Sequence, residues 1–116
     1  GEKVYKIRNN ILNNIKQLKK INKTILGYGA PAKATTALNF LGISKEINFI
    51  VEDNKLKHNK FVPGVKIPIK HKSTIKNKNN FLIVLAWNFY TDIKKNNSGL
   101  SNNFINIKDL ESNNLK

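Results

Sequence analysis

The segment TILGYGAPAKA, residues 24–34, passes from an apolar run through two glycines into a proline. Gly27, Gly29 and Ala32 fit the G-x-G-x-x-G/A spacing of turns that bind dinucleotides, in which a buried strand leads into a helix facing an anion. The groups that could hold a phosphate are the main-chain N–H groups of Gly29, Ala30 and Ala32, with the ammonium group of Lys33. A tight strand–helix turn without any ligand gives the same pattern.

Two further apolar runs end in side chains that could bind a nucleotide or a sugar. Glu52 and Asp53 follow the run 47–51, at the distance from the glycines where a dinucleotide ribose is often held. Trp87 and Asn88 follow the run 81–86 and could stack on and hydrogen-bond a base or sugar. The alternatives are a solvated strand end at Glu52–Asp53 and a Trp87 half-buried under the following helix.

Catalytic and metal-binding patterns are missing from the sequence. The chain has no cysteine, and its two histidines, His58 and His71, each lie among lysines and are expected in solvated loops. No cluster of metal ligands, P-loop spacing or Ser/His/Asp signature is found. We therefore expect no catalytic residue and no metal site.

Length and composition favour one small domain covering residues 1–116. No apolar run is long enough to span a membrane, and the absence of cysteine is compatible with a reducing, cytoplasmic setting. The formal net charge is +14, but Arg8 is the only arginine and the lysines are scattered, so nucleic-acid binding is disfavoured. The charge would rather assist binding of a small anionic ligand.

Hydrophobic periodicity predicts the elements that position these residues. An amphipathic leading helix over 2–21, within the segment 1–22, precedes alternating strands and helices. The predicted strands are 23–27, 47–51, 81–86 and 104–107, with an edge strand at 67–69 where Pro68 is tolerated. The other predicted segments are helices 31–41 and 89–96, a loop at 54–65, a helical turn within 72–77 capped by Ser73 or Thr74, and a polar, frayed tail at 108–116. This order predicts a small Rossmann-like, doubly wound α/β fold with a mainly parallel sheet.

Several segments, in order and over about residues 24–93, resemble the C-terminal domain of sugar C-methyltransferases. These enzymes use S-adenosylmethionine to methylate nucleotide-linked deoxysugars. The matching segments are GYGAPAKATT at 27–36, LNFLGI at 38–43, FIVEDN at 49–54, KFVPG at 60–64, IPI at 67–69 and LAWNF at 85–89. The segment 70–74 departs from the family, because lysines replace the acidic residues expected there.

The resemblance implies that a cysteine-rich zinc domain and an S-adenosylmethionine-binding domain precede this one. The sugar nucleotide would lie between the middle domain and this domain, and the principal acid and base residues would lie upstream. We therefore expect no cofactor in this domain and no methyl transfer by it alone. The motif positions to which we assign substrate contact, from their place at strand ends, are Gly27, Tyr28, Gly29, Ala30, Lys33, Glu52, Asp53, Trp87 and Asn88. An NAD-type dinucleotide-binding module and a non-enzymatic basic binding protein are the alternatives.

Overall fold

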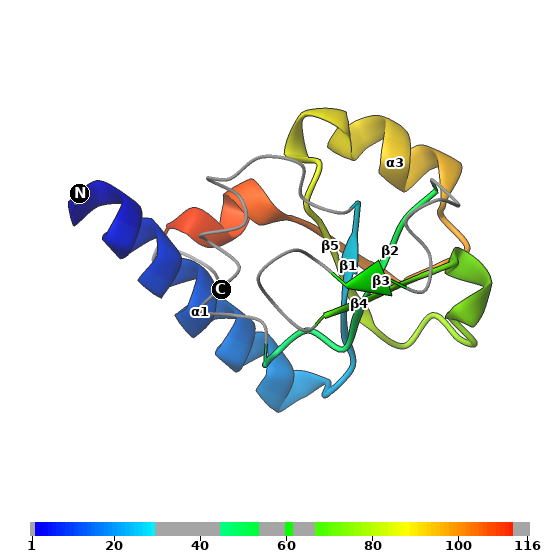
Figure 1. Cartoon of the computed structure of the whole chain (residues 1–116), viewed down its shortest axis with the longest axis horizontal. Coiled ribbons are helices and arrows are strands. Elements are labelled where there is room, and N and C mark those ends of the chain that lie inside the picture. The colour runs from blue at the N-terminus through cyan, green and yellow to red at the C-terminus, as the bar shows by residue number, and fades with distance from the viewer. Residues whose placement is uncertain (1, 30–44, 54–59, 62–66, 113–116) are drawn as a thin grey trace.

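The computed structural model describes residues 2–29, 45–53, 60–61 and 67–112 (Figure 1). It is an α/β fold built on one six-stranded sheet with the strand order β3-β4-β2-β1-β5-β6. The strands are β1 (Ile25–Tyr28), β2 (Phe49–Val51), β3 (Lys60–Phe61), β4 (Pro68–Lys70), β5 (Phe81–Val84) and β6 (Asn103–Asn106). The strands from β4 to β6 in this order are parallel, and β3 pairs antiparallel with β4. The predicted Rossmann-like, mainly parallel sheet is confirmed.

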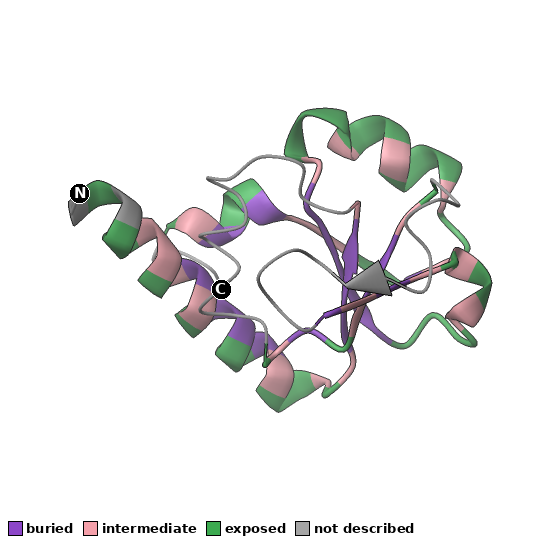
Figure 2. Cartoon of the chain, viewed as in Figure 1, coloured by how far each residue is buried: buried purple, intermediate pink, exposed green. Residues whose placement is uncertain are grey.

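The sheet is covered on both faces, which is why its inner strands are apolar without interruption. On one face, helix α1 (Glu2–Ile21) and the 3-10 helix η4 (Ile107–Glu111) pack on the sheet through Ile11, Ile15 and Leu110. On the other face, helix α3 (Tyr90–Asn96) covers a second cluster that contains Leu26, Leu82 and Val84 (Figure 2). Successive residues of a strand alternate between these two clusters.

Helix α1 has the bounds that its periodicity predicts, and α3 confirms the helix expected over 89–96. The strands expected over 23–27, 47–51, 81–86 and 104–107 are all present, with bounds shifted by a few residues. No helix in the described part of the chain is both long and apolar enough to cross a membrane. The predicted helix over 31–41 lies outside the described residues.

The region between β2 and β5 differs from the prediction in two ways. Lys60–Phe61, expected within a loop, forms β3 and pairs with β4. Strand β4 is therefore not an edge strand, since β2 lies on its other side. The 3-10 helix η2 (Lys72–Thr74) confirms the expected helical turn, but His71 is its cap: the Ser73 N–H donates to His71 Nδ1 at 3.1 Å. An imidazole nitrogen here takes the role expected of a hydroxyl.

Residues 108–112 of the tail expected to fray are ordered, because α1 holds them. Residues 113–116 lie outside the described residues. Asn14 Nδ2 donates to the carbonyl oxygens of Leu110 and Ser112, at 2.8 Å each, and Asn10 Nδ2 donates to that of Glu111 at 3.0 Å. Leu110 is fully buried beneath the helix. Within this polar segment, Leu110 packs in the core and three main-chain carbonyl oxygens accept hydrogen bonds from α1.

Candidate functional site

Three neighbouring strands, β2, β1 and β5, end side by side at the carboxyl edge of the sheet. Tyr28 is paired in register with Val51 on one side and with Val84 on the other. The strand order reverses between β1 and β5. After β1, the chain adds β2 and β4 on one side of it and then β5 and β6 on the other side. Open α/β sheets bind ligands at such a reversal, outside the carboxyl ends of the strands. The residues that follow β1, β2 and β5 therefore form the candidate site.

Both glycines of the turn are required by local geometry. A Cβ atom on Gly27 would lie 3.1 Å from Ile50 Cγ1 and 3.3 Å from Leu85 Cδ1, so a side chain there would crowd the core. Gly29 has a φ of +88°, in the left-handed region that glycine adopts without steric cost. The tight turn predicted from G-x-G is thus present.

The N–H group of Gly29 does not serve the predicted phosphate site. It donates to the carbonyl oxygen of Val51 at 2.8 Å and so extends the hydrogen bonds between β1 and β2 by one residue. A donor engaged in this way is not available to a phosphate oxygen. The other groups of the predicted phosphate site, on Ala30, Ala32 and Lys33, lie outside the described residues.

Tyr28 and Asp53 form the most closely defined polar contact at this edge. The Tyr28 hydroxyl donates to Asp53 Oδ2 at 2.7 Å, and the Tyr28 residue is only 3% exposed whereas Asp53 is exposed. Burial raises the pKa of the Tyr28 hydroxyl well above its ordinary value, and the hydrogen bond to Asp53 and the Asp53 charge add to this. Tyr28 is therefore a neutral hydrogen-bond donor at physiological pH and cannot act as a general base.

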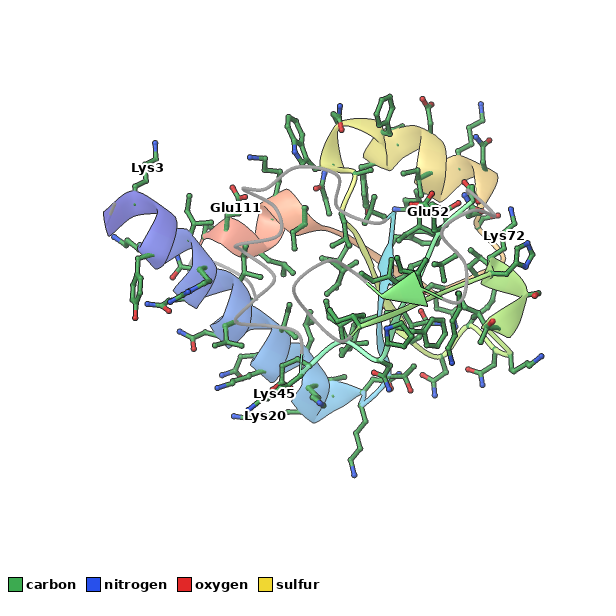
Figure 3. The ribbon with its side chains drawn as sticks, in the orientation of Figure 1. Lys3, Lys20, Lys45, Glu52, Lys72 and Glu111 are labelled. Atoms are coloured by element: carbon green, nitrogen blue, oxygen red, sulfur yellow. The ribbon has the colours of Figure 1, made fainter. Side chains whose placement is uncertain are left out.

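Further polar side chains surround this pair. Asn97, at the end of α3, lowers the Tyr28 pKa and so opposes the larger effects, while the nearby charge of Glu52 raises it. Lys72 Nζ donates to Asn97 Oδ1 at 3.4 Å, and this contact joins η2 to α3. In Figure 3, Glu52 and Lys72 lie toward the α3 side of the molecule, whereas Lys3 and Lys20 lie on α1 and Lys45 lies near its end. These labelled lysines do not form one basic patch.

Trp87 and Asn88 lie in the 3-10 helix η3 (Trp87–Phe89), directly after β5. Trp87 is 51% exposed, so about half of this residue is buried, as the alternative to a ligand contact expects. Asn88 is exposed. Lys108 Nζ lies 4.8 Å from the centre of the Trp87 ring and covers one of its faces. Only the opposite face of the indole remains for stacking on a ligand. The turn adjoins this segment, since a Cβ on Gly29 would lie 3.4 Å from Ala86 Cβ.

Sequence reasoning missed three residues at this edge. Phe89 is 58% exposed beside Trp87, and Asn97 and Lys108 reach Tyr28 and Trp87 from other elements. Phe89 could have been found, because it continues the aromatic run after β5. No sequence pattern around Asn97 or Lys108 indicates that these residues lie at the site. Within the described ranges, no group of three or more potential metal ligands occurs, and His71 is an exposed capping residue.

A separate cavity of about 240 Å³ lies at the opposite, amino-terminal edge of the sheet. Its polar lining mainly shapes the local turns: Asn22 Nδ2 donates to Asn79 Oδ1, and Asn22 Oδ1 accepts from the Thr24 N–H, at 2.9 Å each. The buried Asn80 amide donates to the carbonyl oxygens of Asn77 and Leu100. The amide nitrogens of Asn22 and Asn80 are thus engaged within the protein, whereas the buried Asn80 Oδ1 has no hydrogen-bond partner among the described residues. We regard this cavity as a weaker candidate than the carboxyl edge, because it lies away from the strand ends that carry the sequence motifs.

Comparison with known proteins agrees with the architecture and the motif order. Residues 1–106 match the family described as the C-methyltransferase C-terminal domain. Over 76 residues the chain is 36% identical to C-methyltransferase NovU of Streptomyces niveus, an alignment that covers 64% of this chain. The same alignment covers 18% of NovU, so the chain corresponds to a small part of that relative.

Proposed function

Because this chain belongs to the family of C-methyltransferase C-terminal domains, we propose that it binds the substrate of an S-adenosylmethionine-dependent C-methyltransferase. The substrate is a nucleotide-linked deoxysugar, held at the carboxyl edge of the sheet. The methyl donor and the residues that move protons belong to an upstream domain, against which this domain presents the sugar. We place the protein in the cytoplasm.

The observation that carries this proposal is the reversal of strand order between β1 and β5. It places the Gly29 turn next to the segment that begins at Ala86. One open face of Trp87 could stack on the base or the sugar, and Asn88 could hydrogen-bond to it. Asp53, held by Tyr28, adds acceptors on the other side of the turn. This arrangement binds and orients a ligand, and its neutral Tyr28 does not supply a base.

Amide chemical shifts test the proposal. We would titrate the chain with thymidine diphosphate rhamnose, a nucleotide-linked 6-deoxysugar, alone and with an upstream methyltransferase domain added. Shifts are expected at Gly27, Gly29, Asp53 and Trp87. The buried Ser101, at the opposite edge, serves as the internal control. Unchanged signals at the carboxyl edge in both titrations would refute the substrate-binding role.

A parallel titration with NAD separates the main alternative. A redox-type dinucleotide-binding module should show shifts at the Gly29 turn with millimolar NAD and none with the nucleotide sugar. The reverse result is expected here, because the chain belongs to the family of C-methyltransferase C-terminal domains.

A further inference from the structure

We propose that Tyr28 and Asp53 act together to recognise sugar hydroxyl groups, with Asp53 accepting their hydrogen bonds and Tyr28 fixing the orientation of the Asp53 carboxylate. This inference rests on the proposed function and specifies which part of the ligand this edge recognises. Tyr28 is in this view a positioning residue, and Asp53 is the residue that touches the ligand.

Tyr28 is held firmly enough to position another group. It ends β1 and is paired with a strand on each side, and its own carbonyl oxygen accepts from the Leu85 N–H at 2.9 Å. Its ring packs in the buried cluster with Leu26 and Val51. A side chain restrained by packing and main-chain pairing presents its hydroxyl at a fixed place.

The hydroxyl of Tyr28 fixes only part of the carboxylate. A carboxylate offers about four lone-pair sites on its two oxygens. The 2.7 Å hydrogen bond to Oδ2 uses one of them, and Asp53 itself is exposed. Because Tyr28 stays protonated, this bond does not depend on pH in the physiological range. Asp53 thus keeps acceptor sites that face solvent, while the hydrogen bond from Tyr28 fixes the orientation of its carboxylate.

The charges at this edge favour hydroxyl groups over phosphate as the partner of Asp53. Glu52 and Asp53 are adjacent carboxylates, and the nearby Gly29 N–H is occupied by Val51. Carboxylates repel a phosphate and accept hydrogen bonds, so a sugar hydroxyl, which donates, is the complementary group. The diphosphate would have to be bound by other residues than this pair.

Calorimetric titration with thymidine diphosphate rhamnose and with thymidine diphosphate, which lacks the hexose, tests the pair. Asp53→Asn should weaken binding of the sugar nucleotide about tenfold, as loss of a hydrogen bond to a charged group predicts, and leave binding of the diphosphate unchanged. The Tyr28 hydroxyl will still select the amide oxygen, so that the amide NH₂ faces the ligand. Asp92→Asn, an exposed position on α3, is the control for the same change in charge.

Tyr28→Phe should weaken binding of the sugar nucleotide severalfold and, like Asp53→Asn, leave binding of the diphosphate unchanged. Tyr90→Phe is the matched control, because the Tyr90 hydroxyl also donates one hydrogen bond, to the Phe104 carbonyl oxygen at 3.1 Å. The double variant Tyr28→Phe/Asp53→Asn should bind no worse than Asp53→Asn alone. Without the phenol, the amide is free to turn its oxygen toward the ligand, so the two changes are not additive.

The outcomes separate the two proposals. If the unaltered chain binds the sugar nucleotide but Asp53→Asn and Tyr28→Phe bind it as their controls do, the pair is refuted and the substrate-binding role stands. If both variants lose the diphosphate as much as the sugar nucleotide, the pair serves the anion or the fold, and the inference is also wrong. If the unaltered chain binds neither ligand, alone or with the upstream methyltransferase domain added, both proposals fail together.

Discussion

The hydroxyl of Tyr28, buried at the end of β1, donates a 2.7 Å hydrogen bond to the exposed carboxylate of Asp53 after β2. The contact joins the two strand ends that flank the glycine turn. It also gives the fold an alkaline limit, because the folded chain keeps the phenol protonated above the pH at which the unfolded chain loses this proton.

The free energy of unfolding should decrease above pH 10 because of Tyr28. Below pH 10 this tyrosine is protonated in both states. Above it, the unfolded chain loses the proton while the folded chain, with its raised pKa, retains it. Stability then falls by about 1.4 kcal/mol per pH unit for one such group. Urea unfolding followed by circular dichroism at pH 9, 10 and 11 measures the slope. Tyr28→Phe should reduce it and leave the part due to Tyr90, whose pKa burial also raises, whereas Tyr5→Phe, an exposed ring, should leave it steep.

Gly29→Ala should destabilise the chain by about 1–2 kcal/mol, the usual cost of placing a side chain in the left-handed region. Gly27→Ala should cost about 1–3 kcal/mol for a different reason, since its Cβ would crowd Ile50 and Leu85. Gly99→Ala is the control, because its Cβ meets nothing within 4 Å. Chemical denaturation measures all three. Equal effects of the three substitutions would contradict this account.

Asn14→Ala should cost about 1–3 kcal/mol, because it leaves the Leu110 and Ser112 carbonyl oxygens without their donor. Asn14→Asp should be worse, since a carboxylate would face two carbonyl oxygens and donate nothing. Asn10→Ala removes a single hydrogen bond that is less buried, so it should lower the free energy of unfolding by less. Hydrogen exchange of residues 107–112 should accelerate in the Asn14 variants while exchange in β5 stays slow. Uniform acceleration throughout the chain would mean that Asn14 supports the whole fold.

Lys108→Ala should uncover the second face of Trp87, the only tryptophan in the chain. The substitution removes a cation–π contact of about 0.5–1 kcal/mol at an exposed site. Acrylamide should then quench Trp87 fluorescence more efficiently. Lys94→Ala, which removes the lysine 6.0 Å from the Tyr90 ring, is the control and should leave quenching unchanged. Identical quenching in both variants would show that Lys108 does not cover the indole.

Features with a local cause were predictable from sequence. Helix α1 follows from the spacing of its apolar residues, and β1 and β5 follow from runs that are apolar on both faces. The short strand β3 was missed because two residues give no periodicity and their pairing with β4 is a tertiary contact. His71 was missed as a cap because hydroxyl side chains are the usual choice there.

The candidate site was predictable as a set of residues and not as a set of contacts. Tyr28, Asp53 and Trp87 were each identified from their place at strand ends. The hydrogen bond between Tyr28 and Asp53, and the position of Lys108 on Trp87, depend on side-chain directions that no sequence pattern specifies. The engagement of the Gly29 N–H was hidden for a related reason, since it depends on the register between β1 and β2.

The hydrogen bonds between Asn14 and the segment after β6 affect the order in which the chain folds during synthesis. The two ends of this contact are separated by 96 and 98 residues, so α1 leaves the ribosome long before its partner exists. Until then, the apolar stripe around Ile11 and Ile15 has no finished surface to cover it. Contacts between distant segments close slowly, which makes docking of residues 107–112 a late folding step. In a nascent chain, α1 should therefore remain accessible to chaperones or proteases until residue 112 has emerged.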